Sequence, residues 1–82
     1  MESVTKVCTR SDFQMELEFN TGETHIFDVR PYLEKGVYRR LKDVSLFKQA
    51  YVAFDTVCWP GEIDIAPETL YDTSVPLQQM ES

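Results

Sequence analysis

The feature that most constrains the fold is a block of thirteen residues from Trp59 to Tyr71, which reads WPGEIDIAPETLY. Trp59 ends an apolar run typical of a strand, and Pro60-Gly61 is a pair typical of a tight turn. Ile63-Asp64-Ile65 alternates as a returning strand, and Pro67 can begin a helical turn because proline is tolerated at the first helical position. We therefore expect two antiparallel strands and a helix within this short block.

Alternation of apolar and polar residues predicts further strands along the chain. The strand at 14–19 places its apolar residues on the core face, and the polar segment 20–23 that follows is a hairpin turn. If Thr21-Gly22 is a two-residue loop, Glu18 faces His25 on the exposed side of the hairpin. The remaining strands are expected at 4–9, 24–29, 51–54, 57–59 and 63–65.

The helical signals are short. Asp43 is the expected N-cap of a helix over 44–50. Residues 73–82 are expected to fray, because apolar residues are sparse there and Pro76 interrupts any regular element. The buried stripe of the 44–50 helix is expected to contain Val44, Phe47 and Ala50 or Tyr51. Other helical turns are expected at 31–36, 37–42 and 67–71.

The length of 82 residues predicts a single domain over 1–82. A chain of this size buries only about 60–65% of its unfolded surface, which leaves little core to spare for a deep cleft. The elements predict the α+β class, with a mainly antiparallel sheet and short helices packed on one face. The expected core contains Leu17, Ile26, Phe47, Val52, Val57, Trp59 and Leu70.

The sequence carries no signal for a membrane or for export. No apolar run approaches the ~20 residues that cross a bilayer, and the first residues, MESV, lack a basic or apolar leader. We therefore expect a cytoplasmic protein without membrane contact. Cys8 and Cys58 lie in apolar runs, and we expect both to be buried free thiols in a reducing compartment.

The formal charge of −6 is unevenly distributed. Residues 30–48 hold six basic and two acidic side chains, whereas the rest of the chain holds two basic and twelve acidic ones. An acidic body disfavours binding to nucleic-acid phosphates and favours a basic partner. Solvated, solubilising faces are the simpler interpretation of the same pattern.

Candidate chemistry is sparse. His25 is the one histidine, with no metal-ligand spacing or nucleophile motif around it, and the three glycines are too isolated to form a phosphate loop. Arg39-Arg40 can grip phosphate or belong to a solvated helix face. Trp59 can stack on a ligand or anchor the core. Four carboxylates can converge at one sheet end for acid–base work or cation binding, or can serve as turn and cap residues: Asp55, Glu62, Asp64 and Glu68.

Several pieces of the chain, in this order and spacing, resemble a small bacterial family known as a domain of unknown function, DUF2442. The resemblance implies an α+β fold with an antiparallel sheet and genes often found beside small toxin-like genes. It implies no reaction, no cofactor and no catalytic residue. The matching pieces are the Phe19…Gly22-Glu23 hairpin, Phe27 to Leu33, Gly36-Val37-Tyr38, Leu41-Lys42-Asp43, Phe47 and the Trp59–Tyr71 block.

Together these observations predict a non-enzymatic protein-interaction module, with an antitoxin-like partnership to a small, basic, toxin-like protein as its specific form. A homodimer is left open, and we expect no catalytic, cofactor-binding or metal-binding residue and no nucleic-acid binding by the chain alone. The alternative is a small-ligand or divalent-cation sensing domain that uses the sheet end around Trp59 and Asp64. The candidate interaction surface contains Trp59, Glu62, Asp64, Glu68, Arg39 and Arg40.

Overall fold

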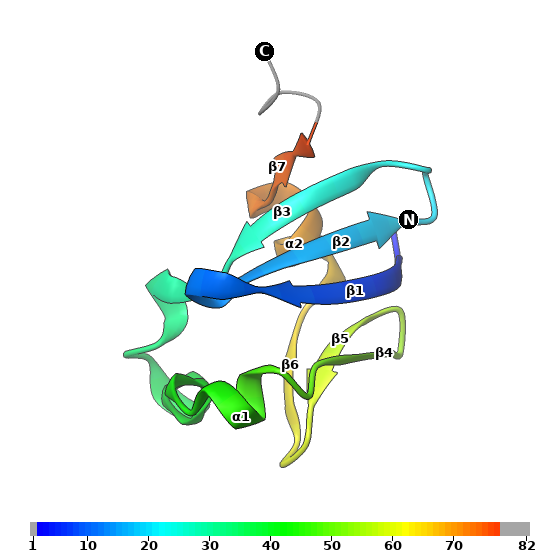
Figure 1. Ribbon diagram of the computed structural model, residues 1–82. Coiled ribbons are helices and arrows are strands. Elements are labelled where there is room, and N and C mark those ends of the chain that lie inside the picture. The colour runs from blue at the N-terminus through cyan, green and yellow to red at the C-terminus, as the bar shows by residue number, and fades with distance from the viewer. Residues whose placement is uncertain (1, 78–82) are drawn as a thin grey trace.

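The computed structural model describes residues 2–77, which form two antiparallel sheets and several short helices (Figure 1). In Figure 1 the first sheet lies in the upper half of the molecule, with helix α2 behind it, and the second sheet lies below. The predicted α+β class is confirmed, although the strands divide between two sheets. The first sheet has the order β1 (Val4–Arg10), β2 (Gln14–Phe19), β3 (Thr24–Asp28) and β7 (Val75–Pro76). The second sheet has the order β4 (Tyr51–Ala53), β5 (Thr56–Trp59) and β6 (Ile63–Ile65).

The helices are short, and the longest two, η3 and α2, have seven residues each. Asp43 caps α1 as predicted, because its carboxylate accepts a hydrogen bond of 3.0 Å from the Ser45 N–H. The expected helix over 44–50 ends at Phe47, so only one turn faces the core; Phe47 is buried, but Val44 is 49% exposed. The helices are η1 (Ser11–Phe13), η2 (Arg30–Tyr32), η3 (Gly36–Lys42), α1 (Val44–Phe47) and α2 (Pro67–Thr73).

The register of the β2–β3 hairpin differs from the prediction by one residue. Leu17 lies opposite His25, and Glu18 lies opposite Thr24. The loop has three residues rather than two, because the Phe19 N–H donates to the Glu23 carbonyl and Gly22 closes the turn at φ +91°. A shift of one residue moves a side chain to the other face of a strand. His25 therefore points inward and is only 2% exposed, which corrects the expected exposed histidine.

The core lies between the two sheets and beneath the helices. The Trp59 side chain is completely buried, and its indole N–H donates to the Phe47 carbonyl at 2.9 Å, so Trp59 is a packing anchor. Val52 was expected in the core but is 37% exposed, because β4 is an edge strand. The other six predicted core residues are buried: Leu17, Ile26, Phe47, Val57, Trp59 and Leu70.

Regular structure extends further toward the C-terminus than expected. Helix α2 runs to Thr73, and β7 pairs with β3 so that Val75 lies opposite Ile26. The described part of the expected frayed tail, up to residue 77, is thus connected to the sheet, and residues 78–82 lie outside the described residues. Among residues 2–77, no helix is both long and apolar enough to span a membrane.

The two cysteines have different environments. Both are free thiols; Cys58 is buried, as expected, whereas Cys8 is exposed. Cys8 pairs with Glu16 on the outward side of β1, an edge strand of the first sheet, which corrects the expectation that both thiols are buried.

Candidate interaction groove

One row of side chains crosses the outer face of the second sheet. Tyr51, Cys58 and Asp64 lie opposite one another on β4, β5 and β6, so they share a face. The next residues along the strands, such as Val57 and Trp59, alternate to the opposite face and are buried in the core. The row therefore faces away from the core, with Tyr51 and Asp64 exposed on either side of the buried Cys58.

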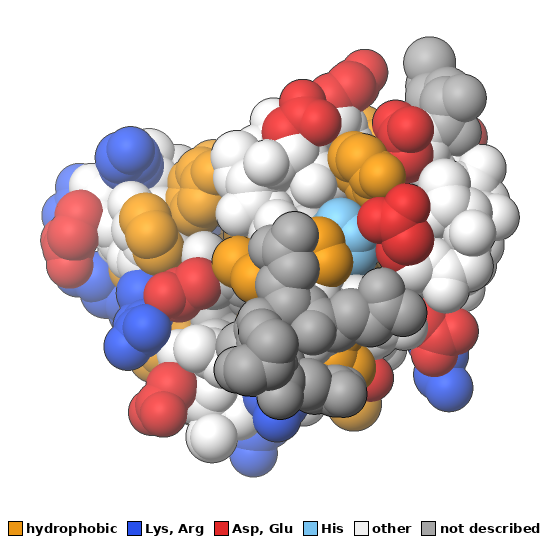
Figure 2. Space-filling model, turned by 90° about the horizontal axis from the view of Figure 1, so that it is seen from above, with side chains coloured by type: hydrophobic (Ala, Val, Ile, Leu, Met, Phe, Trp, Pro, Cys, Tyr) orange, Lys and Arg blue, Asp and Glu red, His pale blue; other side chains and the backbone are white. Residues whose placement is uncertain are grey.

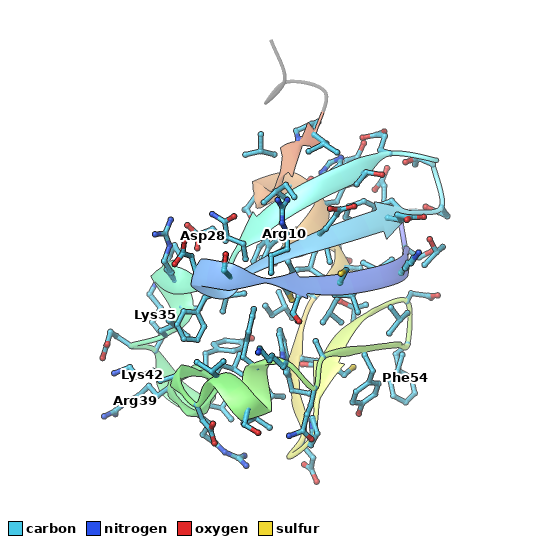
Figure 3. The ribbon with its side chains drawn as sticks, in the orientation of Figure 1. Arg10, Asp28, Lys35, Arg39, Lys42 and Phe54 are labelled. Atoms are coloured by element: carbon cyan, nitrogen blue, oxygen red, sulfur yellow. The ribbon has the colours of Figure 1, made fainter. Side chains whose placement is uncertain are left out.

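The β4–β5 turn presents an aromatic ring to solvent. Phe54 and Asp55 form a two-residue loop with φ values of +54° and +66°, a conformation that favours Asn and Gly and disfavours a bulky side chain. Phe54 is nevertheless 90% exposed, so it gains almost no burial in return. Figure 3 shows its ring projecting from the edge of the second sheet. Neither turn geometry nor packing explains a phenylalanine at this position.

The β5–β6 turn forms the other wall. Gly61 and Glu62 have positive φ values of +92° and +65°. The Arg40 guanidinium lies directly against Gly61, where a Cβ atom would come within 2.7 Å of its nitrogens, and Nη1 donates to the Gly61 carbonyl at 3.4 Å. The positive φ favours glycine at this position, whereas the Arg40 side chain, contacted at its flexible end, could move away from a Cβ atom.

Between these two turns lies an open groove of about 590 Å³. Tyr51 and Phe54 supply aromatic surface to it, Glu62 and Asp64 supply carboxylates, and Cys58 contributes to its lining between them. The groove thus joins an apolar half to an acidic half.

Two groups in and beside the groove keep their protons at neutral pH. Burial, and secondarily the negative charge of Asp64, raise the pKa of the Cys58 thiol, so it stays protonated and weakly reactive at neutral pH. The Asp64 main chain is held by the Tyr38 hydroxyl, which donates to its carbonyl at 2.7 Å. Burial, followed by the charge of Asp64, raises the pKa of Tyr38 as well, so this donor keeps its proton.

The groove contains only part of the surface predicted from the sequence. Glu62 and Asp64 line it, and Arg40 lies against its Gly61 wall. Trp59 is also among the residues that line the groove, but its side chain is completely buried and cannot offer its ring to a ligand there. Glu68, in the first turn of α2, does not line the groove.

The other arginine of the predicted pair lies elsewhere. Arg39 is exposed on η3 and, with Lys42, lies on the opposite side of the molecule from Phe54 in Figure 3. In Figure 2, seen from above, Lys and Arg side chains are concentrated toward the side that η3 occupies. Arg39 and Lys42 are therefore distant from the acidic groove, and of the predicted pair only Arg40 lies beside it.

Sequence reasoning missed the two aromatic residues of the groove. Tyr51 and Phe54 stand in an apolar run that predicts a buried strand, and periodicity does not distinguish a central strand from an edge strand. The available signal was the two-residue connection itself, because a phenylalanine in a tight hairpin turn conflicts with turn preferences.

A second polar cluster surrounds His25, contrary to the expectation that no nucleophile lies beside it. His25 Nδ1 is 2.6 Å from the Ser74 hydroxyl, and Nε2 is 2.8 Å from a carboxylate oxygen of Glu23. The Tyr71 hydroxyl donates to the same carboxylate at 3.0 Å. The hydrogen bond from His25, followed by that from Tyr71, lowers the pKa of Glu23.

This cluster contains the residue types of a hydrolytic triad, but its pattern of hydrogen bonds indicates a structural role. In a serine-protease triad the nucleophile faces Nε2 and the carboxylate faces Nδ1, which is the reverse of the arrangement around His25. Ser74 and His25 are both buried, and they join the end of α2 to β3. We assign the cluster to the attachment of α2 and β7 to the first sheet.

Among residues 2–77, no group of three or more His, Cys, Asp or Glu side chains has an arrangement that could hold a metal ion. Glu62 and Asp64 are thus an acidic pair on a groove, without the third ligand of that kind that would favour divalent-cation sensing at this sheet end.

These features define the class as a small α+β domain with two antiparallel sheets and an exposed aromatic and acidic groove. The sequence pattern of the family described as "Protein of unknown function (DUF2442)" matches residues 4–76. The chain therefore belongs to this family, and the resemblance stated above is confirmed. No curated protein and no solved structure matches the chain.

Proposed function

We propose that this domain is a non-enzymatic protein-interaction module and that the groove on the second sheet is its binding surface. The observation that carries the proposal is Phe54, a bulky side chain that is 90% exposed at a positive-φ turn position. Such backbone strain costs of order 1–3 kcal/mol and is concentrated in proteins at functional sites.

The surroundings of Phe54 support the same function. Tyr51 on the edge strand β4 is exposed beside it, so two aromatic side chains line the same groove. Aromatic residues at the centre of a patch, with polar groups around them, are typical of protein interfaces and of their energetic hot spots. Tyr51 supplies both a ring and a hydroxyl, which suits a surface that is wet when free and dry when bound.

The charge of the domain favours a basic partner. The chain carries a formal charge of −6, and Glu62 and Asp64 add local negative charge at the groove. Complementary charge accelerates encounter and selects partners. The specific form of the proposal, suggested by the family resemblance, is an antitoxin-like partnership with a small, basic, toxin-like protein.

A capture experiment with matched variants tests this function. The tagged domain is used to capture proteins from its source cells, and Tyr51→Ser is compared with Val44→Ser. Both substitutions remove an exposed apolar side chain, but Val44 lies on α1 and does not line the groove. We expect one basic protein that is retained by the wild type and by Val44→Ser and lost by Tyr51→Ser.

The salt dependence of that association provides the second readout. We expect the association rate to fall steeply between low salt and ~0.5 M, where the Debye length is below ~5 Å. The isolated domain should show no affinity for duplex DNA at ~0.15 M salt, because its net field repels phosphate. A partner held equally by both variants, or tight salt-sensitive binding to DNA, would contradict the proposal.

A further inference from the structure

The groove carries negative charge that takes part in no ion pair of the described residues. The five ion pairs of the described residues use Glu16, Glu18, Glu23, Asp28 and Glu34. Within residues 2–77, no Lys or Arg nitrogen lies within 4.0 Å of the Glu62 or Asp64 carboxylates. The nearby Arg40 is engaged with the Gly61 carbonyl instead. Two exposed carboxylates therefore share one groove, and neither forms an ion pair with a Lys or Arg of the described residues.

The aromatic half of the groove selects among the ligands that these carboxylates can attract. A cation positioned over an aromatic face is attracted by the ring quadrupole. Tyr51 and Phe54 line the groove together with Glu62 and Asp64, so one side chain can contact a ring and a carboxylate at once. A guanidinium is planar, stacks on aromatic rings and pairs with carboxylates through a fork of donors, whereas an ammonium is a compact and strongly hydrated charge.

We propose that this groove binds an arginine side chain presented by a linear segment of a partner protein, held between the Tyr51–Phe54 rings and the Glu62–Asp64 carboxylates. This inference rests on the proposed function and names the chemistry that the interaction surface recognises. The guanidinium supplies the two carboxylates with an ion-pair partner, and the aliphatic part of the arginine side chain covers the exposed aromatic surface.

The rigidity of the site favours this recognition. The Asp64 carbonyl is fixed by the Tyr38 hydroxyl, and the Gly61 wall is backed by Arg40, so η3 supports the acidic half from behind. Arg40 donates to the Gly61 carbonyl and forms no ion pair with either carboxylate. Little of the binding free energy is then spent on ordering the acidic wall.

Nuclear magnetic resonance titration with defined peptides tests the inference. The probes are the acetylated and amidated peptide Gly-Ser-Arg-Ser-Gly and matched peptides with lysine or citrulline in place of arginine. Citrulline keeps the shape of arginine but has no charge. We expect the arginine peptide to shift the amide signals of Tyr51, Phe54, Cys58, Glu62 and Asp64, with lysine binding more weakly and citrulline at least about tenfold more weakly.

Matched variants separate the site from the overall charge. Glu62→Gln combined with Asp64→Asn should weaken the arginine peptide about tenfold or more, whereas Glu68→Gln with Asp72→Asn removes the same charge outside the groove and should change the affinity less than about twofold. Equal binding of the citrulline peptide, or equal losses in the two double variants, would overturn the inference. So would self-association of the domain that the groove variant abolishes, because a second copy would then be the occupant.

The outcomes for the inference and for the proposed function are distinguishable. If no peptide shifts the groove signals but Tyr51→Ser still loses the captured partner, arginine recognition is wrong and the interaction surface remains. If the peptide binds in the groove but Tyr51→Ser and Val44→Ser retain the same partner, the groove is an arginine site and the proposed interaction surface is wrong.

Discussion

The two sheets treat their polar surfaces in different ways. On the first sheet, exposed charges pair with neighbours: Lys6 with Glu18 at 3.9 Å and Arg30 with Asp28 at 2.8 Å. On the second sheet, Glu62 and Asp64 lie unpaired beside the exposed Phe54. Exposed ion pairs contribute little to stability. The difference between the sheets therefore matters for which carboxylates can pair with another molecule, and not for the free energy of unfolding. The carboxylates of the first sheet form ion pairs within the domain, whereas Glu62 and Asp64 of the second sheet remain available to the proposed partner.

The buried side of the second sheet should show the largest effect on stability. Trp59→Ala removes a completely buried ring and its hydrogen bond to Phe47, which should destabilise the domain by about 3–5 kcal/mol. Domains of this size have a total stability of about 4–12 kcal/mol, so the variant should be largely unfolded. Thermal denaturation followed by circular dichroism measures this. A variant that kept its melting temperature would mean that Trp59 does not anchor the core.

A buried polar connection in the first sheet should have the next largest effect. His25→Ala breaks hydrogen bonds to Ser74 and Glu23 and leaves the buried serine without that partner, which should cost about 1–3 kcal/mol. Chemical denaturation measures the loss, and hydrogen exchange should place it in β3 and α2. If partner binding were lost while the free energy of unfolding stayed unchanged, the cluster would have to be reinterpreted as a functional site.

On the outer side of the second sheet, we expect a substitution to increase stability. Phe54→Asn replaces a bulky residue at φ +54° with one that tolerates this conformation, and it gives up almost no buried area. The free energy of unfolding should rise by about 1 kcal/mol. Glu18→Asn, at an exposed position on β2, is the control and should bring no such gain. A drop in the melting temperature of Phe54→Asn would show that Phe54 contributes to the fold.

The smallest expected effect is a pH dependence to which two carboxylates of the first sheet contribute. The pKa of Glu23 is lowered by its hydrogen bonds to His25 and Tyr71, and the pKa of Asp28 is lowered by Arg30. A carboxylate with a lowered pKa in the folded state stabilises the fold above its unfolded pKa, and this contribution is lost as the pH falls through the folded value. Stability should therefore decline below about pH 4.5.

The variant Glu23→Gln localises that decline. Its melting temperature should be lower than that of the wild type at pH 7 and should fall less between pH 5 and pH 3, since one of the titrating groups has been removed. Equal acid sensitivity in both proteins would show that Glu23 does not take part in the decline.

The strands themselves followed closely from the sequence. Segments 14–19 and 63–65 form strands with the predicted bounds, because strict alternation leaves one consistent way to bury their apolar side chains. The register in which the strands pair was harder to predict from the sequence. Residues 20–23 are compatible with a two-residue or a three-residue loop, and that one-residue difference moved His25 from the surface to the core.

The candidate site could be predicted only in part for a related reason. Glu62 and Asp64 were selected from a turn block whose local order is strongly constrained, and they do line the groove. Trp59 was placed on the same surface, but alternation along β5 directs it to the core. Tyr51 and Phe54 were missed because the exposure of an edge strand depends on how the strands divide between sheets, a property of the whole fold.

The affinity of the Phe54→Asn variant for the captured basic partner, measured beside its melting temperature, tests the central claim most directly. The account predicts a melting temperature equal to or above that of the wild type together with an affinity at least about tenfold weaker, which corresponds to a hot-spot aromatic. An unchanged affinity in this well-folded variant would contradict the claim that the groove on the second sheet is the binding surface.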